Sequence, residues 1–93
     1  MEISRMLTIS TAHITESTAK ELENFGPPIP DWLCWLSVYT KSDYGWWIFV
    51  DDSEPTTPSD LAACLRLARR HNCEWLCLDC DGEIVDELPT YDW

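Results

Sequence analysis

Basic side chains are scarce in this 93-residue sequence. Six Lys and Arg stand against 17 Asp and Glu, which gives a formal net charge of −11. A chain with so negative a charge is repelled by nucleic-acid phosphates and by anionic lipid headgroups. We therefore expect no direct binding to nucleic acid or to a membrane surface, and we expect a partner chosen by charge to be basic.

Long hydrophobic runs and glycine-rich loops are also missing. No apolar stretch approaches the roughly 20 residues of a membrane span, and the N-terminus lacks the basic and then apolar pattern of a secretory signal. The three glycines, Gly26, Gly45 and Gly82, are isolated from one another, so the chain has no glycine-rich phosphate loop. Five cysteines without a signal peptide are typical of reduced thiols. These absences predict a cytoplasmic protein without disulfides.

Large apolar side chains, in contrast, are plentiful. Hydrophobic residues make up 45% of the sequence, and six of them are Trp. Disordered acidic chains contain few such side chains, so this composition predicts a folded core. Because 93 residues leave no room for a second core, we expect one acidic α+β domain over residues 1–93.

The hydrophobic periodicity predicts strands alternating with two helices. Thr15 is a candidate N-cap for the first helix and Ser59 for the second. The clearest hairpin joins two aromatic runs across a turn at residues 41–45. The predicted strands cover residues 6–10, 32–40, 46–50 and 75–79, with a short extra strand at 83–85, and the predicted helices cover residues 16–24 and 59–71.

The resulting order, β-α-β-β-α-β, is that of a ferredoxin-like antiparallel sheet with both helices on one face. Side chains alternate between the two faces of a strand. Some of the tryptophans at Trp35, at Trp46 or Trp47, and at Trp75 must therefore point to the second face of the sheet. Six tryptophans exceed what the core of so small a domain needs, and the surplus favours an interface.

Four segments, taken together, resemble a known protein family. They are Leu7–Thr15 (LTISTAHIT), Asp43–Val50 (DYGWWIFV), Cys73–Asp79 (CEWLCLD) and Leu88–Trp93 (LPTYDW). They look like a family of small uncharacterised bacterial proteins encoded on prophages, plasmids and genomic islands. The resemblance implies cargo of a mobile genetic element, with an anti-defence or toxin–antitoxin role. It implies no catalytic residues.

Zinc-type ligands occur at His71, Cys73, Cys77 and Cys80. Their spacing is poor for a metal site, because Cys77 and Cys80 would project to opposite faces of one strand. No local motif activates any of the cysteines as a nucleophile. We therefore expect no metal, no cofactor and no catalytic residue, and we do not expect an enzyme.

Two further charged patterns have simple interpretations. Asp79, Asp81 and Glu83 resemble the first half of a calcium loop, but the later ligands and the closing glutamate are missing. Three arginines on the second predicted helix hold half of the positive charge, and favourable interaction with the helix C-terminus explains them. The alternative for these arginines is a small anion site.

Negative charge dominates the C-terminal part of the chain. Residues 74–93 contain seven acids and no Lys or Arg, and a second acidic cluster follows the predicted hairpin. A surface of one sign costs self-repulsion, so a role in recognition is a reasonable hypothesis, with solubility alone as the alternative. The predicted contact residues are Asp51, Asp52, Glu54, Asp79, Asp81, Glu83, Asp86, Glu87, Tyr91, Asp92 and Trp93.

These observations favour a non-enzymatic acidic binding protein from a mobile element. In its most concrete form it inhibits a host defence protein, of the CRISPR or restriction machinery, by occupying a basic nucleic-acid-binding surface as a DNA mimic. One alternative is an antitoxin or regulatory partner that caps a small toxin. Another is a metal-binding protein or a Cys-dependent enzyme. We expect a monomer or a small homo-oligomer.

Overall fold

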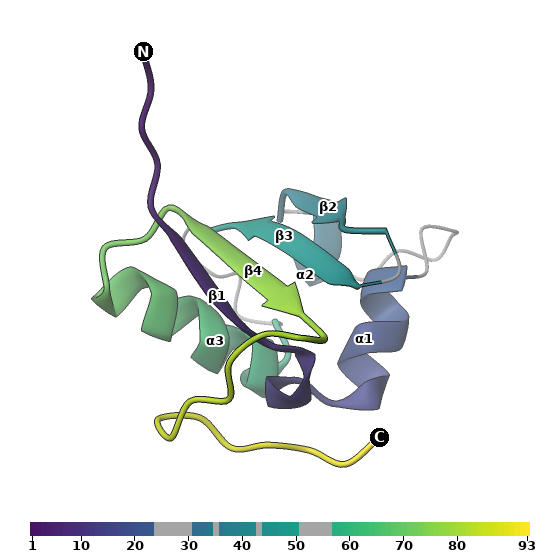
Figure 1. Ribbon diagram of the computed structural model, residues 1–93. Helices are drawn as coiled ribbons and strands as arrows, with labels where there is room; N and C mark the ends of the chain where they lie inside the picture. The colour runs from purple at the N-terminus through teal and green to yellow at the C-terminus, as the bar shows by residue number, and fades with distance from the viewer. Residues whose placement is uncertain (24–30, 35, 43, 51–56) are drawn as a thin grey trace.

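A computed structural model describes residues 1–23, 31–34, 36–42, 44–50 and 57–93 (Figure 1). The four strands are β1 (Met6–Ser10), β2 (Val38–Thr40), β3 (Gly45–Phe49) and β4 (Trp75–Asp79). The helical elements are the short 3-10 turn η1 (Thr11–His13) and the helices α1 (Glu16–Glu23), α2 (Asp31–Cys34) and α3 (Ser59–Arg70). The end of the first predicted helix, residue 24, lies outside the described residues.

The strands form one mixed sheet in the order β1-β4-β3-β2. β2 pairs antiparallel with β3, which confirms the predicted hairpin, and β3 pairs antiparallel with β4. The α+β class is confirmed, but the prediction of an entirely antiparallel sheet was wrong, because β1 pairs parallel with β4. After α3 the chain returns between β1 and β3, so β4 becomes a central strand that runs in the direction of β1.

One face of the sheet forms the hydrophobic core with the helices. Ile9, Ile48, Leu76 and Leu78 are 0% exposed and come from three of the four strands. They pack against apolar residues of α1, α2 and α3: Ala19, Leu22, Trp32, Leu33, Leu61, Cys64, Leu65 and Ala68. The main helices α1 and α3 therefore cover the same face, as predicted, and Figure 1 shows both below the sheet.

The two main helices are tied together at their first turns. Thr15 is confirmed as a capping residue, since its Oγ1 accepts a hydrogen bond from the Thr18 N–H at 3.2 Å. The buried Asp60 carboxylate accepts from the Thr15 N–H at 2.7 Å and from the Thr18 hydroxyl at 3.0 Å. The predicted cap at Ser59 was wrong, because Ser59 is the first residue of α3 and Pro58 occupies the N-cap position.

Two predicted strands are corrected by the structure. In the segment predicted as a strand over 32–40, residues 31–34 form helix α2 and only Val38–Thr40 form a strand. Trp32 and Leu33 are adjacent and both buried in the core, which a helix allows and an alternating strand on this sheet does not. Residues 83–85 form no strand, because only one backbone hydrogen bond, from the Ser10 N–H to the Glu83 C=O at 2.9 Å, joins them to β1.

Candidate protein-binding surface

The second face of the sheet carries aromatic side chains that the helices do not cover. Register places Met6, Trp75 and Phe49 in one row across the sheet, and Trp47 and Tyr39 in the next. We call these five residues the aromatic face. Tyr39 is 56% exposed, Met6 47% and Phe49 39%, while Trp47 and Trp75 are half-buried. The prediction that some tryptophans point to the second face is confirmed for Trp47 and Trp75.

The rings of the aromatic face are arranged around Trp75. Its centroid lies 5.3 Å from that of Phe49 in an edge-to-face contact and 6.0 Å from that of Tyr39 in a tilted one. Met6, Tyr39, Trp47 and Trp75 line a shallow hollow of about 240 Å³. Because three of these rings stand on paired strands, a partner would meet side chains that lose little conformational freedom on binding.

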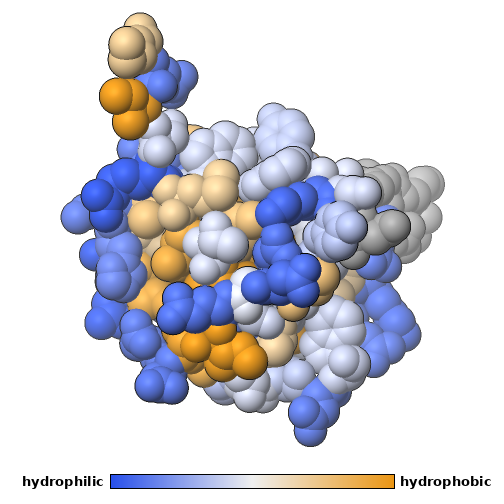
Figure 2. Space-filling model, in the orientation of Figure 1, coloured by the Kyte–Doolittle hydropathy of each residue, from blue (hydrophilic) through white to orange (hydrophobic). Residues whose placement is uncertain are grey.

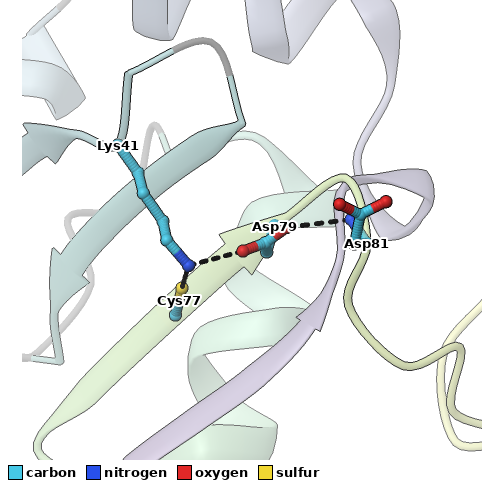
Figure 3. Close-up of polar contacts among 4 residues, drawn as sticks. All are labelled: Lys41, Cys77, Asp79 and Asp81. Atoms are coloured by element: carbon cyan, nitrogen blue, oxygen red, sulfur yellow. Dashed lines mark hydrogen bonds and ion pairs between the residues drawn. The ribbon is translucent and has the colours of Figure 1, made fainter.

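An ion pair closes one end of this surface (Figure 3). The Lys41 Nζ lies 2.5 Å from the Asp79 Oδ2, 3.8 Å from the Cys77 Sγ and 5.7 Å from the centre of the Trp47 ring. The hydrogen bond from Lys41, assisted by the Asp81 backbone N–H at 2.8 Å, holds the pKa of the Asp79 carboxyl below its usual value. The same hydrogen bond raises the pKa of Lys41. Asp79, a predicted contact residue, is therefore neutralised within the fold.

Exposed acids precede and follow β4, an interior strand of the sheet, and the Glu74 carboxylate accepts a hydrogen bond from the Arg5 backbone N–H at 2.8 Å. Asp81 comes just after the strand and Glu74 just before it, and both are exposed.

Hydrophobic residues also reach the surface elsewhere. Ile84 is exposed, and Figure 2 shows hydrophobic side chains, bordered by hydrophilic ones, in the middle of the side turned to the viewer.

The C-terminal segment, residues 80–93, is anchored by the buried His13 ring. The His13 Nδ1 lies 2.8 Å from the Pro89 C=O, and its Nε2 accepts from the Val85 N–H at 3.0 Å. A carbonyl oxygen only accepts, so Nδ1 must be the protonated nitrogen, and the ring is a neutral imidazole with both nitrogens engaged. This buried histidine is a structural anchor that sequence reasoning missed, because its partners lie 72 and 76 residues away.

Two aromatic residues at the end of this segment also contact the domain. The Tyr91 backbone N–H donates to the Ala12 C=O at 2.8 Å, and the Trp93 indole N–H donates to the Ile14 C=O at 2.8 Å. The C-terminal segment therefore lies along η1 and the start of α1, away from the aromatic face (Figure 1).

The structure separates the predicted contact residues that it describes into three groups. Asp81, Glu83, Asp86, Glu87 and Asp92 are exposed on the C-terminal segment, whereas Asp79 is paired with Lys41. Tyr91 and Trp93 touch the domain as described above. Asp51, Asp52 and Glu54 lie outside the described residues. The residues of the aromatic face were absent from the predicted contact residues. The alternation of large side chains along the strands was the sequence pattern that pointed to this face.

The cysteines occupy different environments. Burial, with a smaller contribution from the Asp60 charge, raises the pKa of the Cys64 thiol to about 12, so this thiol stays protonated at neutral pH. Cys77 is buried beside Lys41, and Cys80 is exposed. Two of the zinc-type ligands named from the sequence, His71 and Cys73, are neighbours: the Cys73 thiol donates a weak hydrogen bond to the His71 C=O at 3.7 Å.

Among the described residues, Asp79, Cys80 and Asp81 form a cluster of possible metal ligands. Their ligand atoms lie within 4.8 Å of one another, close enough to share a cation. Asp79 already accepts hydrogen bonds from Lys41 and from the Asp81 backbone, which leaves a weak ligand set.

These features define a small α+β domain with helices on one face of a mixed sheet and aromatic side chains on the other. Residues 6–93 match the family of unknown function DUF5983, C-terminal domain, and the chain belongs to this family. No curated protein and no solved structure matches it. Within the described ranges, no helix has the length and apolar character needed to cross a membrane.

Proposed function

We propose that the chain is a non-enzymatic protein-binding domain that docks its aromatic face on a basic surface of another protein. The observation that supports this most directly is the exposure of Tyr39, Phe49 and Met6 on strands whose other face packs against the hydrophobic core. Tyr and Trp supply much of the binding energy at protein interfaces because they bury large areas at low entropic cost.

The charge of the chain favours a different protein as the partner over a second copy. Two copies meeting through the aromatic face would bring together two net charges of −11, which repel each other over the Debye length. The face itself carries the Lys41–Asp79 pair, with exposed acids at Glu74 and Asp81 before and after β4. A partner with an apolar patch surrounded by Lys and Arg matches this pattern.

The form of the proposal that we favour is an inhibitor of a nucleic-acid-binding protein. Acidic groups on a rigid domain occupy a basic channel in place of phosphates, and the aromatic face adds apolar contact. The resemblance to proteins of prophages, plasmids and genomic islands makes a host defence protein, of the CRISPR or restriction machinery, the target of this form. Because Asp79 is neutralised by Lys41, the charge mimicry rests on the exposed acids and not on Asp79.

Capture from a host lysate with matched variants tests the docking surface. Tyr39→Thr combined with Phe49→Thr removes two rings and keeps residues that strands accept. The control is Ile84→Thr, which removes an exposed apolar side chain outside the aromatic face. We expect the double variant to weaken binding of the captured protein at least tenfold, and the control to bind like the wild type. Equal binding by all three chains would contradict docking through the aromatic face.

A second set of variants tests the role of charge. The triple change Asp81→Asn, Glu83→Gln and Asp86→Asn removes three exposed charges and leaves the Lys41–Asp79 pair intact. We expect slower association with the captured protein at low salt and a smaller difference at high salt, because ions screen the attraction. Unchanged association at low salt would show that these acids serve solubility and not recognition.

A further inference from the structure

A second and larger hollow lies beside the turn of the β2–β3 hairpin. Its volume is about 580 Å³, which falls within the range of about 300–1,000 Å³ of small-ligand sites. Its lining brings together the end of α1, the hairpin, the residue after β4 and the end of the C-terminal segment. The residues used below are Glu23, Tyr44, Gly45, Trp46, Cys80 and Trp93.

The walls of this hollow are fixed by backbone contacts. Trp46 is buried and Gly45 beside it approaches β4 so closely that an added Cβ would lie 1.7 Å from the Leu78 carbonyl oxygen. The Cys80 N–H donates to the Tyr44 C=O at 2.8 Å, which holds the hairpin against the end of β4. Tyr44 is 54% exposed and Trp93 is 53% exposed. The hollow therefore has a buried aromatic residue in its wall and two accessible rings.

Among the described residues, the lining contains three aromatic side chains and one carboxylate but no positive charge. All six Lys and Arg of the chain lie at positions 5, 20, 41, 66, 69 and 70, and neither they nor the two histidines line the hollow. The negative faces of Trp and Tyr rings attract cations, and the Glu23 carboxylate adds to this attraction. An anion or a nucleotide phosphate would find no cation to pair with.

We infer that this hollow is a binding site for a guanidinium group, supplied by an arginine side chain of the basic partner. Arginine fits better than lysine because its planar group stacks on aromatic rings and also donates paired hydrogen bonds to a carboxylate. The inference deepens the proposed function and rests on it for the source of the arginine. It does not depend on the aromatic face, since none of the six residues named above belongs to it.

A short peptide supplies a probe with a neutral twin. The tripeptide acetyl-Gly-Arg-Gly-amide is titrated into the purified chain. The control is the same peptide with citrulline in place of arginine, which has a neutral urea of the same shape instead of the guanidinium group. The readout is the indole N–H resonance of each tryptophan. We expect the arginine peptide to shift the signals of Trp46 and Trp93 and the citrulline peptide to leave them in place.

Two variants and a control assign the binding to the hollow. Tyr44→Leu should weaken binding of the arginine peptide by about 2- to 30-fold, the range that follows from a cation–π contact of about 0.5–2 kcal/mol. Glu23→Gln removes an exposed carboxylate and should weaken binding by about 1.5- to 5-fold, as expected for an exposed ion pair. Glu2→Gln makes the same change as Glu23→Gln at an exposed glutamate outside both the hollow and the aromatic face, and it should leave peptide binding unchanged. Thermal unfolding of each variant checks that the fold is retained.

Three results would overturn the inference. They are equal shifts with arginine and citrulline, equal affinity for an otherwise identical lysine peptide, or full binding by both Tyr44→Leu and Glu23→Gln. The proposed function has its own test, the loss of partner binding in the Tyr39 and Phe49 double variant. If that loss is seen while the arginine peptide leaves Trp93 unshifted, the arginine site is wrong and the docking surface stands.

Discussion

The two faces of the same sheet differ in both chemistry and exposure. On the helix side, Ile9, Ile48, Leu76 and Leu78 are 0% exposed, and all are aliphatic. On the other side, the residues next to them in the strands include Trp47, Phe49 and Trp75. Aliphatic side chains, together with Trp32 and Trp46, pack the core, whereas the rings of the aromatic face are left partly in contact with water. The difference separates residues that hold the domain together from residues available to a partner.

The largest effect is expected at a glycine on which both faces depend. Gly45 has φ 153°, and its Cβ as alanine would meet the Leu78 backbone. Because the atoms that this Cβ would meet are all backbone atoms of Leu78 and Asp79, which cannot move aside as a flexible side chain can, Gly45→Ala should cost more than about 4 kcal/mol of unfolding free energy in urea titrations. Ser42→Gly in the same hairpin is the control, since φ there is 51° and glycine tolerates it. A Gly45→Ala chain with wild-type stability would show that β3 and β4 pair differently.

The comparison of the two faces is tested directly by Leu76→Ala and Phe49→Ala. Leu76 is fully buried, so its truncation should cost about 2–5 kcal/mol through lost burial and a cavity. Phe49 is 39% exposed, so its truncation should cost less: it loses a partly buried ring and the edge-to-face contact with Trp75, which is worth about 0.5–1.5 kcal/mol beyond the buried area. Urea unfolding followed by circular dichroism measures both. Equal losses at the two positions would mean that the aromatic face is part of the core.

Removal of residues 89–93 should have an intermediate effect. The deletion removes the contacts of Pro89, Tyr91 and Trp93 with η1 and Ile14, and it deprives the buried His13 Nδ1 of its acceptor. An unsatisfied buried polar group costs about 1–3 kcal/mol, and each kcal/mol lowers Tm by about 4–8 °C in a domain of this size. Deletion of the exposed residues 1–4 is the control. An unchanged Tm after the C-terminal deletion would show that the segment is not docked.

The smallest effect is expected at the ion pair of the aromatic face. The pKa of Asp79 is lowered in the folded state, so its contribution to stability is present above its unfolded pKa of about 3.9 and is lost as pH falls through the folded value. The raised pKa of Lys41 gives a contribution that is present below about pH 10.4 and is lost as pH rises through its folded value. Asp79→Asn should therefore flatten the acid side of a plot of urea midpoint against pH. An acid side as steep as that of the wild type would contradict this role.

Much of the fold was predictable because local patterns agree with the tertiary structure. β1, β4 and α3 show clear periodicity, and the capping role of Thr15 was visible from its position before an acidic first turn. The run from Trp32 to Val38 was misread because an apolar stretch without periodicity does not distinguish a buried helical turn from a strand. The order of strands in the sheet depends on packing between distant segments, which no local pattern encodes.

The candidate site was less accessible to sequence reasoning than the fold. Alternation suggested exposed tryptophans, but Tyr39 joins Trp75 only through the register of three strands. Lys41 and Asp79 are 38 residues apart, so the neutralisation of Asp79 could not be foreseen. The tryptophan at 93 offered two interpretations, a docked residue or a free contact residue, and the structure shows it hydrogen-bonded to Ile14 while still half-exposed.

The most direct measurement is a titration of the ¹⁵N-labelled chain with the protein that it captures, followed on its tryptophan indole signals. Docking through the aromatic face predicts that Trp47 and Trp75 shift or broaden, while Trp32, which is buried among the helices, stays in place. Binding of the partner with Trp47 and Trp75 unperturbed would contradict the proposal that this face of the sheet is the protein-binding surface.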